Sequence, residues 1–183
     1  MINTMGKKGD IWISAVLYLA LGLIILSILL AIAMPVVNKY IDQNIFRSSK
    51  GVMQTLDENI VDVSNDGPGS ARFISPFSVE KGKIIIDEVT NTIVWNFETN
   101  AELVSPGIEF KEGNLVILLS ESPTGDDYVM TITRKFSDDE SKVADLIITE
   151  NSLASPFQGV FSLKIENTGF STEVIPKIEI TVS

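Results

Sequence analysis

Apolar and polar positions follow three different patterns along the chain, one after the other. Residues Ile11 to Val37 include no charged side chain and are apolar on every side of a helix. From Asn38 to Asp66 apolar residues recur every three or four positions, which predicts an amphipathic helix. After Gly69 apolar and polar residues alternate in short runs separated by turn formers, which predicts strands.

The first segment predicts a membrane helix. At ~1.5 Å per residue, Ile11 to Val37 would span roughly 40 Å, more than the ~30 Å hydrocarbon core requires. Lys7 and Lys8 precede it, which places the N-terminus in the cytoplasm and the bulk of the chain outside. Pro35 is expected to bend the helix or to open its hydrogen-bond ladder locally.

The second segment extends the same helix, so that one helix is expected from Ile11 to about Val63. Asn65 to Gly69 ends it with turn-forming residues. The charged residues lie largely away from the apolar stripe, which should pack against the domain that follows. The stripe consists of Ile41, Ile45, Val52, Leu56, Ile60 and Val63.

The third segment predicts about eight antiparallel strands around one core, a β-sandwich, so the fold class is α+β. Glu80–Lys83 and Lys111–Asn114 look like hairpin turns, and Pro176 favours an edge position for the last strand. Arg72–Val79 is a weaker first strand. The clearer strands are Lys83–Asp87, Ile93–Glu98, Leu115–Ser120, Tyr128–Phe136, Val143–Thr149, Val160–Glu166 and Val174–Val182.

Composition narrows the functional classes. The chain has 183 residues with no Cys and no His, which removes thiol chemistry and the commonest general base and metal ligand. The net charge of −10 disfavours nucleic acid as a partner. No Gly-x-Ser-x-Gly turn and no phosphate-binding glycine loop occurs, so neither an enzyme nor a cofactor is expected.

Two acidic stretches are candidate calcium ligands. They are Asp126-Asp127 and the run from Ser137 to Glu140. Calcium binds carboxylate oxygens, but the spacing of a calcium-binding loop is absent, and solvated turns between strands have the same composition. We therefore expect no metal. The alternating Trp95 and Phe97 could form a carbohydrate platform, but their spacing favours a place in the core.

The N-terminus carries a short motif. Lys7-Lys8-Gly9, then Asp10, then an uninterrupted apolar helix resembles the class III signal peptides of archaeal type IV pilins and archaellins. The resemblance implies that a membrane prepilin peptidase cuts after Gly9. Ser14 would be the fifth residue of the mature chain, where many pilins carry Glu.

The same resemblance implies a domain organisation: leader 1–9, membrane and filament-core helix 10–37, amphipathic extension 38–66 and extracellular head 70–183. The expected function is a structural subunit, held in the cell membrane before assembly and then packed into a surface filament. The implied partners are copies of itself, lipid, the peptidase and the assembly machinery. The helix positions expected to pack are Ile11, Trp12, Leu17, Leu21, Leu26, Leu30 and Pro35.

A second interpretation remains open. The chain could be a single-pass surface protein whose β domain binds a sugar, a partner or the cell envelope without forming a filament. The mature N-terminus separates the two, because an intact Met1 favours the anchor and a new N-terminus at Asp10 favours the pilin.

Overall fold

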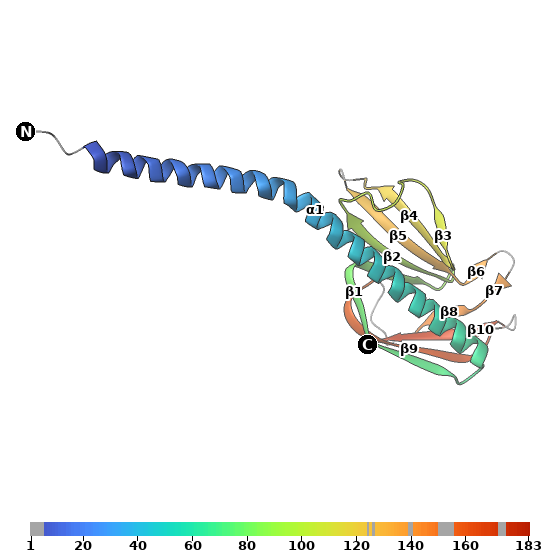
Figure 1. Ribbon diagram of the computed structural model, residues 1–183. Coiled ribbons are helices and arrows are strands. Elements are labelled where there is room, and N and C mark those ends of the chain that lie inside the picture. The colour runs from blue at the N-terminus through green and yellow to red at the C-terminus, as the bar shows by residue number, and fades with distance from the viewer. Residues whose placement is uncertain (1–5, 124, 126, 139–140, 150–155, 172–174) are drawn as a thin grey trace, which may run out of the picture. The chain divides into compact units, whose positions relative to one another are not determined.

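A computed structural model describes residues 6–123, 125, 127–138, 141–149, 156–171 and 175–183, and for 6–11, 138, 141 and 142 only the backbone. One helix, α1 (Gly6–Asp66), runs without interruption through Pro35 (Figure 1). The prediction of a single long helix is confirmed. The chain divides into two compact units, residues 1–40 and 41–183.

The second unit contains an eight-stranded sheet in the order β3-β4-β5-β2-β1-β9-β10-β8 (Figure 1). All neighbours are antiparallel except β8 and β10, which are parallel, and the fold is therefore α+β. A separate ribbon joins β6 and β7. The strands are β1 (Ala71–Asp87), β2 (Thr92–Thr99), β3 (Phe110–Glu112), β4 (Leu115–Glu121), β5 (Tyr128–Lys135), β6 (Ser137–Asp138), β7 (Ser141–Lys142), β8 (Asp145–Ile148), β9 (Phe157–Phe170) and β10 (Pro176–Val182).

Strand β1 overturns the predicted hairpin at Glu80–Lys83. It is one strand, whose first part, from Ala71 to Val79, pairs with β9, whereas residues from Lys83 to Asp87 pair with β2. The register shifts between Val79 and Ile84, and Gly82 lies in that irregularity with a φ of +81°. The glycine marks a bulge after which the strand pairs with β2, while Ile84 also pairs with Phe157 of β9. Such a bulge has the same composition as a turn.

Replacing Gly82 with Ala should strongly destabilise the second unit, residues 41–183, which we call the head. A Cβ built there would lie 1.9 Å from the backbone oxygen of Asn96, and the positive φ is unfavourable for any other residue. Because backbone cannot yield as a flexible side chain can, we expect the melting temperature of the full chain in detergent to fall by several degrees or more. Gly113→Ala is the matched control, since its φ is also positive but its surroundings are open. An equal loss in both variants would contradict the role assigned to the close contact.

The remaining strand predictions are confirmed in part. The turn at Lys111–Asn114 joins β3 and β4, although β3 itself was not predicted. The edge position predicted from Pro176 is wrong, because β10 lies between β9 and β8. Pro176 is tolerated as the first residue of its strand, one position before the pairing with β8 begins at Lys177. The predicted start at Val174 lies outside the described residues.

The core lies between one face of the sheet and helix α1. Met53, Leu56, Ile60 and Val63 of the helix are fully buried in it. Trp95 and Phe97 also lie in the core, as their alternation predicted. Two stripe positions, Ile45 and Val52, are only partly buried. Ile41 was predicted in the stripe but is 52% exposed, because the neighbouring Asp42 is the residue that faces the sheet at this level.

Candidate functional site: an exposed apolar helix anchored in the head

The apolar segment of α1 has its side chains in the open. Its large apolar residues from Trp12 to Val37 are 49–76% exposed, and they include Leu17, Leu21, Leu26 and Leu30. Pro35 is exposed too. Among the described residues this helix is the one candidate for a membrane span, by length and composition. Burying one such side chain is worth about 1.5–3 kcal/mol, so the whole segment favours an apolar environment by tens of kcal/mol.

The predicted processing residues lie at the start of the same helix. The backbone of Lys7, Lys8, Gly9 and Asp10 is helical, as is that of Ile11. Their side chains lie outside the described ones, so the cleavage motif remains a prediction from the sequence.

The C-terminal part of α1 is held in the head by two buried carboxylates that the sequence pattern had placed away from the core. The first is Asp42, only 5% exposed. Its carboxylate accepts hydrogen bonds of 2.7 Å from Lys81 Nζ of β1 and from Thr99 Oγ1 of β2. The helix is thereby tied to both strands that adjoin the bulge at Gly82.

The second buried carboxylate is Asp57, about four turns further along the helix. Its Oδ1 lies 2.5 Å from Arg134 Nε of β5, and its Oδ2 accepts a bond of 2.7 Å from Asn114 Nδ2. Both partners of the ion pair are about nine-tenths buried, and the Arg134 guanidinium also lies 4.4 Å from the ring centre of Phe136. This cluster fixes the helix against β5 and the turn between β3 and β4.

A signal for these carboxylates was present in the sequence. Asp42 and Asp57 fall on the helical positions that continue the buried series through Ser49, Met53 and Ile60. A stripe defined by apolar residues alone leaves both aspartates out. A charged residue at a buried helical position needs a partner, and a strand packed against the helix is where that partner is expected.

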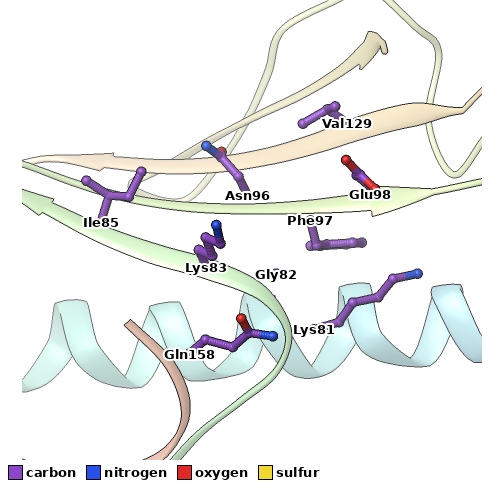
Figure 2. Close-up of a pocket in the computed structure, with 9 residues that line it drawn as sticks. All are labelled: Lys81, Gly82, Lys83, Ile85, Asn96, Phe97, Glu98, Val129 and Gln158. Atoms are coloured by element: carbon purple, nitrogen blue, oxygen red, sulfur yellow. The ribbon is translucent and has the colours of Figure 1, made fainter. Parts of the chain in front are cut away.

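A hollow of about 420 Å³ opens where β1 bends past β2 (Figure 2). Lys83 of β1 pairs in register with Asn96 of β2, and Glu98 and Val129 line the same hollow. The Oδ1 atom of Asn96 is buried and has no hydrogen-bond partner among the described residues. The described residues that line the hollow offer several acceptors and charges of both signs, but no nucleophile paired with a base.

The acidic stretches do not form a metal centre within the described part of the chain. No group of three or more carboxylates there is arranged to hold an ion. Asp126, Asp139 and Glu140 lie outside the described residues, as does the side chain of Asp138. For the two candidate calcium loops as a whole, the absence of a metal therefore stays a prediction from the sequence.

The outer edge of β8 is covered by the turn between β1 and β2. Asn91 Oδ1 accepts a hydrogen bond of 2.8 Å from the backbone of Leu146, and a Glu88 carboxylate oxygen accepts one from the backbone of Ile148. Asp87 holds the turn through Thr90, and that hydrogen bond lowers the pKa of the Asp87 carboxyl. Capped amides cannot pair with a strand from another chain, so this edge is unsuited to strand addition.

Comparisons with models of protein families, with curated proteins and with solved structures find no match to this chain. Its function is therefore inferred from its own residues and geometry.

Proposed function

We propose that this chain is a pilin-like structural subunit that is cut after Gly9 and assembles into a surface filament through its N-terminal helix. The observation that carries the proposal is the difference in burial between two segments of α1. The segment from Met53 to Val63 is core of the head, whereas the described apolar side chains from Trp12 to Val37 are exposed.

An exposed apolar helix has two stable environments. In the membrane, lipid covers it, and in a filament, the same helices of neighbouring copies replace the lipid. Transfer from one to the other exposes little apolar surface to water, so assembly need not overcome the hydrophobic effect. We include in this proposal that the head is pilin-like and that its strands form a sandwich.

Asp10 has a role in this mechanism. After cleavage it would be the first residue of the mature chain, and its carboxylate would lie at the positive end of the helix dipole. In a filament core with little water, it could pair with the freed amino group of a neighbour, because an unpaired charge there is costly.

Replacing Gly9 with Val should stop processing and leave membrane insertion intact. A peptidase must reach the peptide bond after Gly9, and a branched side chain just before that bond obstructs the approach. Insertion depends on Ile11 to Val37, which the change leaves untouched. The measurement is the size of the membrane-bound protein on a gel, together with the mass of its N-terminal peptide.

Gly22→Val is the matched control, because Gly22 lies in the span and a Cβ added there would meet nothing within 4 Å. We expect this variant to be processed as the wild type is, with Asp10 first. If Gly9→Val and the wild type run at the same mature size, the Lys-Lys-Gly motif is not a cleavage site. An N-terminal peptide that begins at Met1 would favour a single-pass anchor.

A further inference from the structure

The solvent-exposed face of α1 within the head separates its charges along the helix. We call this face, made of Arg47, Ser48, Gly51, Thr55, Glu58 and Asp62, the solvent face of α1; all six residues are exposed. Its first residue is basic and its last two are acidic. Arg47, Glu58 and Asp62 have no hydrogen bond or ion pair from their side chains to the described residues. Three charges thus remain available to a partner.

Between its charged ends the solvent face carries only the small residues Ser48, Gly51 and Thr55. A Cβ added to Gly51 would meet nothing within 4 Å, so no contact inside the chain requires a glycine. Glycine nevertheless costs a helix about 1 kcal/mol relative to Ala. Beside it, Val52 and Thr55 line a groove of about 320 Å³ whose other wall is Ile74 and Phe77 of β1. A second helix can approach closely at this point.

The membrane restricts how two copies can meet. Single-pass chains inserted by one route share one orientation, so neighbouring helices are parallel. Without an axial offset, Arg47 would lie beside Arg47 and Glu58 beside Glu58, which is repulsive. An offset of roughly 16–22 Å, equivalent to the separation of Arg47 from Glu58 and Asp62 at ~1.5 Å per residue, brings opposite charges together.

We propose that the solvent face of α1 docks a second copy of this chain in a parallel, axially offset arrangement, with Arg47 of one copy beside Glu58 and Asp62 of the next. This proposal rests on the filament function proposed above and adds the axial offset between neighbouring helices. The two ends of the contact differ, so each copy leaves one end open for another neighbour. Such a contact does not close on itself and propagates as a filament.

Charge reversal tests this register. Arg47→Glu alone, and Glu58→Arg with Asp62→Arg, should each reduce the number of filaments per cell by about five-fold or more, because every subunit contact becomes repulsive. The variant carrying all three changes should restore filaments toward the wild-type number. Within one chain, Arg47 and Glu58 lie roughly 16 Å apart along the helix, too far for a direct pair. Restoration would therefore come from contacts between copies.

The controls match the changes in charge. Lys83→Glu and the pair Glu98→Arg with Glu109→Arg reverse exposed residues of the sheet and its loops, and we expect filament number to stay near that of the wild type. An immunoblot of membranes must show equal amounts of every variant. Filaments unaffected by Arg47→Glu, or a triple variant no better than its parents, would overturn the register. Filaments that never contain the wild-type chain would instead overturn the proposed function.

Discussion

Replacing Leu26 with Asn should leave the chain in the membrane and remove most surface filaments. Leu26 is 52% exposed in the middle of the apolar segment. One Asn costs insertion far less than the remaining apolar residues contribute, so membrane levels should not change. In a close-packed filament core, an amide without a partner costs roughly 1–3 kcal/mol in every subunit. At about 1.4 kcal/mol per decade, each subunit addition would be weakened about 5- to 140-fold.

The measurement is a count of filaments per cell beside an immunoblot of the membranes. Leu26→Ile is the control, since it keeps an apolar side chain of the same size. A lone anchor in lipid should reach the surface equally well in all three forms. Filament numbers that do not respond to Leu26→Asn would therefore leave the single-pass surface protein as the better interpretation.

Removing the carboxylate of Asp57 should destabilise the head by about 3–5 kcal/mol. The change leaves the Arg134 guanidinium, itself about nine-tenths buried, without its charged partner, and Asn114 loses an acceptor. For a domain of this size such a loss lowers the melting temperature by roughly 6–20 °C. The measurement is thermal unfolding of full-length Asp57→Ala in detergent, followed by near-ultraviolet circular dichroism.

Asp66→Ala is the matched control. Asp66 also lies on α1 and also pairs with an arginine, Arg72, at 2.7 Å, but both side chains are more than 40% exposed. An exposed pair contributes at most about 1 kcal/mol, so little change is expected. If both variants lose equal stability, the cluster around Asp57 does not anchor the helix as described.

Long-range periodicity made the larger elements predictable. The apolar run and the stripe through Leu56 and Ile60 predicted one long helix, and the alternation around Trp95 predicted a strand with that residue in the core. Local composition could not separate a bulge from a turn at Gly82, because both favour a glycine with positive φ. Whether β10 lies at an edge depends on which strands pair on either side of it, which is a property of the whole sheet. The local sequence at Pro176 could therefore not predict that position.

The anchoring site was harder to predict than the helix that contains it. Asp57 and Arg134 are 77 residues apart in sequence, so no short pattern links them. A buried ion pair is recognised by the burial of both partners, and burial follows from packing. The solvent face of α1 was equally hidden, since in the sequence Arg47 and Glu58 resemble the other exposed charges, and only the structure places them on one face of the helix.

For the proposed filament subunit, the covered edge of β8 bears on the supply of chains for assembly. In the proposed assembly, the filament would draw on chains held side by side in the membrane, where heads would collide far more often than dilute proteins do. An unsatisfied strand edge would let some of these collisions end in exchanged strands, and such chains would be lost to assembly. Glu88 and Asn91 occupy the amides of Ile148 and Leu146 within each head. In the proposed assembly, the β8 edge of each head would thus be closed to strand exchange with its neighbours.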